Sequence, residues 1–358
     1  MTYFTPESRL VALLCVPLPA GGLINQTPTG LWQGETTRPL SPKQWFIFNE
    51  RLTSAGGHDG GSQPVACPPD SFDLNNIEQA DVSVLAKVLN LPESDAIQIR
   101  KRLDSVEVVE IELDRLQELG IWMVTIADPD YPNRLRENLP IQAPPVLFGV
   151  GDPKALDRGG LAVVGPRNSN DSDLFFAKEI GELCAKEGIQ VISGAAKGID
   201  RYAMTGAMEA GGQVVGVLGD SLEKHAKDPD MQQLVSSGQL TLVTCYHPKS
   251  HFEVGKAMGR NKLIYALADW ALVVSCQVGQ GGTWHGATSA LKSLNIPVFV
   301  RTDTDLSPGN LELLKRGALE FPQLPWKNLV ESLTVLSENY RPKKSIPNDQ
   351  VGLFDDEE

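Results

Sequence analysis

The stretch Leu161-Ala162-Val163-Val164, followed directly by Gly165-Pro166-Arg167-Asn168-Ser169, is a short apolar run that ends in a polar loop containing a glycine. Five further apolar runs follow it, and stretches of helical length separate them. These runs cover residues 190–192, 214–218, 240–244, 271–275 and 297–300. Because buried strands that alternate with helices build doubly wound sheets, we predict an α/β fold. Its sheet is expected to be extended, Rossmann-like and mostly parallel.

The residues before this pattern predict a small helical module over residues 1–119. Ser41-Pro42-Lys43-Gln44 has the features of a helix start, with a proline in the first turn and a reciprocal Gln. Short helices are expected over 82–91, 94–103 and 106–119, the last ending at Gly120. Residues 56–69, dense in Gly, Pro and Ser, predict a flexible loop. Short strands over 121–126 and 146–148 open a Rossmann-like domain over 120–328, and 329–358 is predicted to be a disordered acidic tail.

The composition excludes several classes of protein. The chain has 358 residues, 41% hydrophobic and 22% charged, which is typical of folded chains. Its net charge of −13 argues against nucleic-acid binding through a uniformly basic surface. Residues 161–300, however, carry 12 basic and 13 acidic side chains. This segment is nearly neutral and can therefore hold a local basic site.

The cysteines indicate a reducing compartment. All five are widely separated and none forms a CxxC pair, which predicts no structural zinc. We also expect no other metal and no cofactor. The apolar segment over 10–23 is interrupted by Pro17, Pro19 and Gly21-Gly22, and no apolar run reaches the length of a membrane span. We therefore expect a cytoplasmic protein that does not interact with membranes.

Ligands of parallel sheets bind at the carboxyl ends of the strands, so the loops after the apolar runs are the candidate site. After the first run, Gly165 allows close approach of a ligand and Arg167 can form a forked contact with a phosphate. After the second run, Ser193-Gly194-Ala195-Ala196-Lys197-Gly198 offers free backbone N–H groups and a cation, which predicts an anion cradle. It is not a Walker loop, because GxxxxGK[ST] is absent.

Two further segments complete the candidate site. Lys249, Phe252 and Lys256 precede Gly259-Arg260-Asn261-Lys262, and cations beside an aromatic suit a strand of nucleic acid, phosphate on Arg or Lys and base on Phe. Gly281-Gly282-Thr283 brings glycines to a helix start after the fifth run. His285 beside it has no convincingly spaced catalytic partner. Solvated helix charges and tight turns remain the simpler explanation of each segment taken alone.

Taken together, three segments in this order resemble the DNA-processing protein A (DprA/Smf) family. They are Gly165-Pro166-Arg167, Ser193-Gly194-Ala195-Ala196-Lys197-Gly198-Ile199-Asp200 and Gly259-Arg260-Asn261-Lys262-Leu263-Ile264. The resemblance covers roughly residues 120–302. Met204 and Ala257-Met258 depart from the family pattern, which places the chain in a divergent branch without an evident C-terminal winged helix.

The resemblance implies a non-catalytic protein that binds single-stranded DNA in a basic pocket. It also implies a homodimer that helps to load a RecA-like recombinase in DNA recombination or transformation. In this interpretation Arg167, Lys197 and Arg260 hold phosphates, Lys262 and one of Lys249 and Lys256 assist, and Phe252 stacks on a base. The remaining residues assigned to the DNA site are Gly165, Ser193, Gly194, Gly198, Asn261, Gly282 and Thr283.

Two alternatives stay open. One is a DprA-like regulator or antitoxin that restrains a toxin or effector partner in a phage-defence system. The other is a nucleotide-binding or nucleotide-hydrolysing enzyme of the same superfamily, although Gly281-Gly282-Thr283 lacks the Glu that marks such enzymes.

The extreme C-terminus carries one further motif. Gln350-Val351-Gly352-Leu353-Phe354 is similar to the peptides that dock in the bacterial sliding clamp. Gln350, Leu353 and Phe354 are therefore a candidate clamp-binding segment.

Overall fold

The computed structural model describes residues 5–17, 39–55, 77–303, 306–323, 328–338 and 340. The predicted loop over 56–69 and the predicted clamp-binding residues Gln350, Leu353 and Phe354 lie outside these residues.

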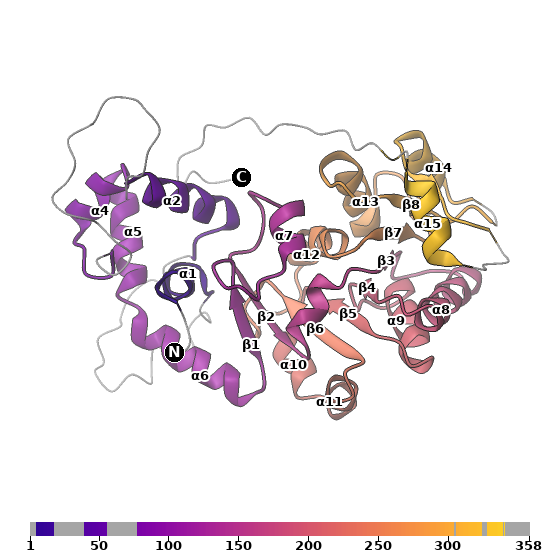
Figure 1. Cartoon of the computed structure of the whole chain (residues 1–358), viewed down its shortest axis with the longest axis horizontal. Coiled ribbons are helices and arrows are strands. Elements are labelled where there is room, and N and C mark those ends of the chain that lie inside the picture. Colours follow the sequence, from indigo (N-terminus) through magenta and orange to yellow (C-terminus); the bar gives the residue numbers. More distant parts are fainter. Residues whose placement is uncertain are drawn as a thin grey trace.

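A nine-stranded sheet forms the centre of the protein, in the order β1-β2-β6-β5-β4-β3-β7-β8-β9 (Figure 1). The strands are β1 (Trp122–Thr125), β2 (Val146–Val150), β3 (Leu161–Val164), β4 (Val191–Ser193), β5 (Val214–Val217), β6 (Leu240–Thr244), β7 (Trp270–Val273), β8 (Val298–Val300) and β9 (Leu319–Glu320). All neighbours from β6 to β9 run parallel, whereas β1 and β2 pair antiparallel at one edge. The predicted α/β fold with a mostly parallel sheet is confirmed, including all six strands expected from the apolar runs.

Five helices of the described residues precede the sheet: α1 (Pro6–Cys15), α2 (Pro42–Ala55), α4 (Val82–Val88), α5 (Glu93–Leu103) and α6 (Val106–Glu118). The start of α2 forms as its sequence predicts, because the backbone N–H of Ser41 donates to Gln44 Oε1 and the N–H of Gln44 donates to Ser41 Oγ. Beyond α6, Gly120 has φ +69°, the left-handed conformation expected at a helix end.

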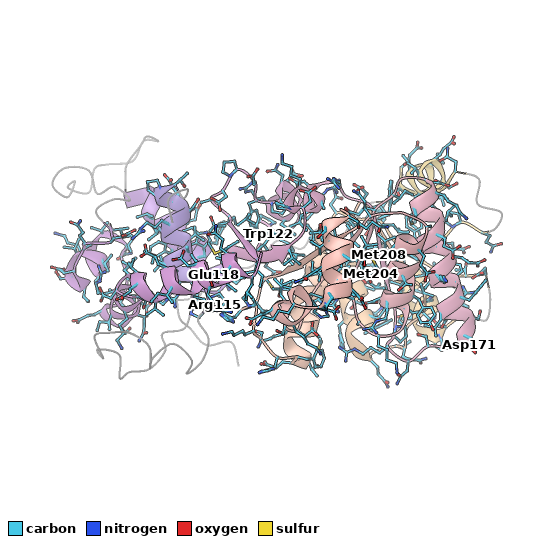
Figure 2. The ribbon with its side chains drawn as sticks, turned by 90° about the horizontal axis from the view of Figure 1, so that it is seen from below. Arg115, Glu118, Trp122, Asp171, Met204 and Met208 are labelled. Atoms are coloured by element: carbon cyan, nitrogen blue, oxygen red, sulfur yellow. The ribbon has the colours of Figure 1, made fainter. Side chains whose placement is uncertain are left out.

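The other helices alternate with the strands. They are α7 (Asn133–Asn138), the 3-10 helix η1 (Pro153–Asp157), α8 (Asp171–Lys186), α9 (Ile199–Glu209), α10 (Leu222–Ala226), α11 (Pro229–Ser236), α12 (Val254–Ala266), α13 (Gly281–Ser293), α14 (Pro308–Lys315) and α15 (Leu329–Ser337). Figure 2 shows Asp171 at one end of α8, and Met204 and Met208 along α9 beside it.

The two faces of the sheet bury separate apolar layers because successive strand residues point to opposite sides. In β3, Leu161 and Val163 pack in a layer with α8, α9 and the N-terminal helices. Ala162 and Val164 pack in the opposite layer, with α7, α12, α13 and α14. This arrangement holds the loops after β3, β4 and β7 at one edge of the sheet.

The predicted disordered tail is wrong over residues 329–337, where the structure forms α15. Leu329 and Leu333, four residues apart, are buried on one side of this helix. The carboxylate of Glu187, just beyond α8, accepts hydrogen bonds from the backbone N–H groups of Leu329 and Val330. Strand β9 was also not expected. Within the described ranges, no helix is both long and apolar enough to cross a bilayer.

Candidate nucleic-acid interface

The loops that the sequence singles out meet at the carboxyl edge of the sheet. Strand β3 is central, and the chain moves from β3 to β4 on one side and later crosses to β7 on the other. This is the topological switch point, where open α/β sheets bind ligands. The loop after β3 begins at Gly165, the loop after β4 at Gly194, and the loop after β7 at Val274.

Arg167 and Phe252 come together at this edge. The Arg167 guanidinium carbon lies 4.4 Å from the centroid of the Phe252 ring, which is cation–π geometry. Both side chains are exposed, Phe252 to 46%. The loop after β3 and the segment before α12 therefore present an aromatic ring and a cation side by side to solvent.

Lys197 lies on the adjacent loop after β4. Its neighbour Gly198 has φ +91°, and a Cβ there would lie 2.4 Å from the carbonyl oxygen of Pro166. Only glycine therefore allows the two loops to pack this closely. The Lys197 side chain is exposed, and no carboxylate of the described residues forms an ion pair with Lys197 or Arg167. Both cations are available to a phosphate.

The predicted backbone anion cradle after β4 is not free, because the protein's own Asp200 occupies it. Buried Asp200 accepts a hydrogen bond of 3.2 Å from the N–H of Gly194. Burial raises the pKa of Asp200, against the opposing effects of the Arg260 charge and of the N–H groups of Gly165, Gly194 and Ala196. The hydroxyl of Ser193 is also buried and donates to the carbonyl of Val163. Ser193 and Gly194 thus shape the loop from inside.

Arg260 lies beneath this loop instead of on the surface. It is 5% exposed, and Nη2 donates to the carbonyl oxygen of Gly194 at 2.9 Å. A Cβ at Gly194 would lie 1.8 Å from Arg260 Nη1, so this contact requires the glycine. Burial lowers the pKa of Arg260; the Asp200 carboxylate opposes this shift and the Arg167 charge adds to it. Arg260 supports the loop and places positive charge under Arg167.

The remaining predicted residues divide between this site and the space beside α12. Lys249 is exposed, whereas Lys256 forms an ion pair of 2.7 Å with Glu253. Of the two, Lys249 is therefore the cation without an ion-pair partner in the described chain. Asn261 Nδ2 donates to the carbonyl of Gly282 at 3.0 Å and ties α12 to the first turn of α13, which also holds Thr283. Lys262 Nζ donates to Gln142 Oε1 at 3.1 Å.

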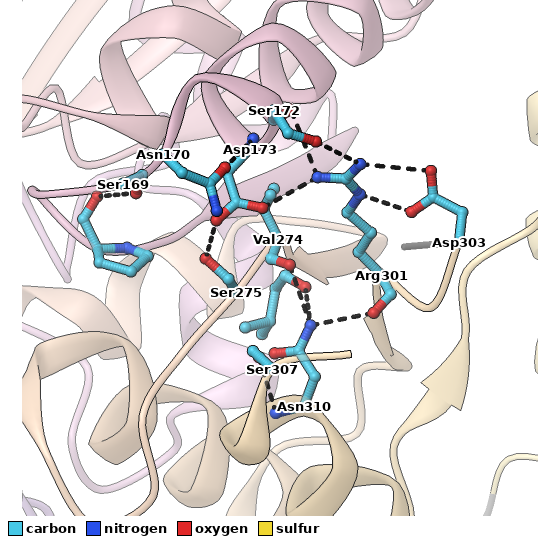
Figure 3. A network of polar contacts seen from close by, with 12 residues as sticks. Ser169, Asn170, Ser172, Asp173, Val274, Ser275, Arg301, Asp303, Ser307 and Asn310 are labelled. Atoms are coloured by element: carbon cyan, nitrogen blue, oxygen red, sulfur yellow. Dashed lines mark hydrogen bonds and ion pairs between the residues drawn. The ribbon is translucent and has the colours of Figure 1, made fainter. Parts of the chain in front are cut away.

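A polar cavity that the sequence did not indicate lies between the carboxyl ends of β3, β7 and β8 (Figure 3). Its volume is about 290 Å³, and its lining includes Ser169, Asp173, Ser275, Arg301 and Asn310. Arg301 is paired with Asp173 at 2.9 Å and with Asp303 at 2.5 Å. Asp173 also accepts from Ser275 Oγ. The only sequence signal was the placement of these polar residues directly after strands or at a helix start.

Comparison with known proteins gives concordant results. The chain is 28% identical over 259 residues to Protein Smf of Synechocystis, a match that covers 68% of this chain and 62% of that protein. It is 25% identical over 270 residues to the DNA processing protein DprA of Bacillus subtilis, covering 69% of this chain and 88% of that protein. The structure of DNA processing protein A from Streptococcus pneumoniae has the same fold, with a TM-score of 0.60 and 19% identity over 78% of this chain and 90% of that one.

The family model for DNA recombination-mediator protein A matches residues 122–332, which span the whole sheet and the helices between its strands. This range includes both loops that carry Arg167 and Lys197, as well as Phe252. More than half of the chain is therefore covered by one family model, and the chain belongs to the DNA recombination-mediator protein A family.

Proposed function

We propose that this protein binds single-stranded DNA at the carboxyl edge of its sheet, without catalysing a covalent reaction. The observation that carries the proposal is the exposed stack of Arg167 on Phe252, beside the exposed Lys197. Guanidinium and ammonium groups bind phosphates, and an exposed ring stacks on an unpaired base. Lys249, three residues before Phe252, adds a further exposed cation to the same loop.

A preference for single strands follows from the exposed ring. Base stacking on Phe252 requires a base whose face is free, and the bases of a duplex are stacked on each other. The net charge of −13 repels DNA as a whole, so binding depends on the few local cations. Affinity should therefore be modest and fall steeply as salt rises.

The cellular role we propose is in DNA processing and recombination, through loading of a RecA-like recombinase on the bound strand. The family and the names of the relatives support this role. A homodimer of this chain would offer two strand-binding sites, and the segment with Leu353 and Phe354 is a candidate contact to the sliding clamp.

The proposal is tested by competition between strands. A labelled single-stranded oligonucleotide is bound to the protein and then displaced by unlabelled single-stranded or duplex DNA of the same sequence. We expect single strands to compete at least about tenfold better, because only they offer free base faces. Equal competition by duplex would show that Phe252 does not stack on bases, and no binding at low salt would contradict the proposed function.

A second candidate function, nucleotide binding, is favoured only by the polar cavity between β3, β7 and β8. Its hydroxyl and amide groups suit a sugar or a base, and the one arginine that lines it, Arg301, is already paired with Asp173 and Asp303. Incubation with nucleoside monophosphates, followed by chromatography for released base, tests hydrolysis. Equilibrium dialysis with the same compounds tests binding, and no retention at millimolar ligand would exclude this function.

A further inference from the structure

A buried polar chain connects α6, the last helix before the sheet, to the loop that carries Lys249 and Phe252. This loop, residues 245–252, lies between β6 and α12. Glu112 of α6 is fully buried, and its Oε1 lies 3.1 Å from Nε2 of His247, which is also buried. This single contact joins two residues that lie 135 positions apart in the sequence.

The other ring nitrogen of His247 contacts the backbone of the loop. Its Nδ1 accepts a hydrogen bond of 3.1 Å from the N–H of Lys249. Since Nδ1 is the acceptor, Nε2 carries the proton and donates to Glu112. The imidazole thus bridges a carboxylate of α6 and the backbone next to the Lys249 side chain.

A second contact from α6 reaches the same loop through α10. Arg115, near the end of α6 (Figure 2), holds Glu112 at 2.6 Å and Glu223 at 2.9 Å. The backbone N–H of Glu223 donates to the carbonyl of Pro248 at 3.0 Å, and Ser221 Oγ donates to the same carbonyl. The loop is therefore held at Pro248 and at Lys249, the two residues that follow His247, by groups linked to α6.

We propose that Glu112 is a positioning residue for DNA binding, and that it acts through His247 to hold Lys249 and Phe252 against Arg167. The proposal rests on the proposed function, because the loop matters only if Phe252 and Lys249 contact DNA. An exposed aromatic at the end of a polar loop needs such a support, since neither its ring nor its backbone is held by a regular strand or helix. A buried carboxylate–imidazole contact has one favoured geometry, which an apolar contact would not impose.

Two substitutions at His247 separate its two contacts. His247→Asn keeps an acceptor at the place of Nδ1, so the N–H of Lys249 keeps a partner, but it is too short to reach Glu112. His247→Gln keeps a donor at the place of Nε2 and loses the acceptor. If Glu112 positions the loop, both variants weaken single-stranded DNA binding by about tenfold, which is about 1.4 kcal/mol. Wild-type affinity of folded His247→Asn would overturn the proposal.

A conservative change at Glu112 provides the matched control. Glu112→Gln keeps an oxygen that accepts from Nε2 and should bind DNA within about twofold of wild type, whereas Glu112→Ala should lose about tenfold. Glu107→Gln removes the same charge from an exposed position of the same helix and should have no effect. Equal losses from Glu112→Gln and Glu112→Ala would mean that charge, and not positioning, is responsible.

A double-mutant cycle tests whether His247 affects DNA binding through the loop. In a background that lacks both loop contacts to DNA, Lys249→Gln with Phe252→Ala, the loss caused by His247→Asn should shrink to less than about twofold. An undiminished loss in that background would show that His247 acts elsewhere, and would contradict the proposal.

Hydrogen–deuterium exchange of the DNA-free protein keeps the test independent of the proposed function. Peptides covering residues 245–252 should exchange at least about tenfold faster in His247→Asn and in Glu112→Ala than in wild type, while peptides of α8 stay unchanged. Unchanged exchange in the loop overturns the positioning role whatever the DNA results are. If wild type binds no DNA but the loop exchange rises as expected, the proposed function fails and the positioning of the loop stands.

Discussion

The guanidinium of Arg167 lies over the ring of Phe252, with its carbon 4.4 Å from the ring centroid, although 85 positions of sequence separate the two residues. One residue follows the central strand β3, and the other precedes α12. The contact therefore unites the two segments on which the proposed DNA site depends. These two exposed side chains can contact DNA, whereas the buried side chains beneath them support the loops.

Arg167 and Arg260 are predicted to behave differently when their charges are removed. Arg167 is exposed and its replacement by Gln should change the free energy of unfolding by no more than about 0.5 kcal/mol. Arg260→Gln leaves Asp200 buried without its cation and should cost about 3 kcal/mol. Urea unfolding measures both. Similar small values for the two variants would show that Arg260 is not a supporting residue.

Phe252 is predicted to contribute by its ring face. Phe252→Ala should reduce affinity for single-stranded DNA by about 1–3 kcal/mol, the usual value of one stacked base. Phe252→Tyr keeps the face and should bind within about twofold of wild type. Anisotropy titrations at one fixed salt concentration measure both. An equal loss in the two variants would point to packing of the loop as the cause.

Gly194 is predicted to tolerate no side chain. Gly194→Ala places a Cβ 1.8 Å from Arg260 Nη1 and should destabilise the protein by about 1–3 kcal/mol. Gly255, near the start of α12, has open space around its Cα, so Gly255→Ala is the matched control and should stabilise by up to about 1 kcal/mol. Thermal unfolding of the two variants checks this, and a loss in the control equal to that of Gly194→Ala would contradict it.

The strands and helices of the core were predictable because each apolar run is long enough to indicate its element from the local sequence. Gly165, Arg167 and Lys197 could be assigned to one edge of the sheet, since the rule for parallel sheets places the ends of β3 and β4 together. The occupation of the loop by Asp200 could not be predicted, because it depends on how Asp200 packs against Arg260, 60 residues away. The helix α15 could not be predicted because its contacts form only when the chain returns to Glu187, just beyond α8.

Glu112 is predicted to make stability depend on pH. Hydrogen bonds from Arg115 and His247 outweigh the effect of burial and lower the pKa of Glu112 from 4.5 to about 2. A carboxyl group whose pKa is lowered by folding stabilises the protein fully above its unfolded pKa and loses this contribution as pH falls to the folded value. The stability difference between wild type and Glu112→Leu should therefore be largest above pH 5 and shrink between about pH 4.5 and 2.

This pH dependence is measured by urea unfolding at pH 7 and pH 3. If the free energies of unfolding of wild type and Glu112→Leu differ by the same amount at both pH values, Glu112 keeps an ordinary pKa in the folded state.

The central claim is that Arg167 and Lys197 each neutralise a phosphate of single-stranded DNA. Its most direct test is the slope of log affinity against log salt for the variant Arg167→Gln with Lys197→Gln. The control, Lys186→Gln with Lys292→Gln, removes the same charge from the last turns of α8 and α13, at the opposite edge of the sheet. Each lost phosphate contact reduces the steepness of this slope for single strands by about 0.7. The slope of the first variant should therefore differ from that of wild type by about 1.4, and the slope of the control should equal that of wild type. A slope that changes equally in both variants, or in neither, would contradict the account.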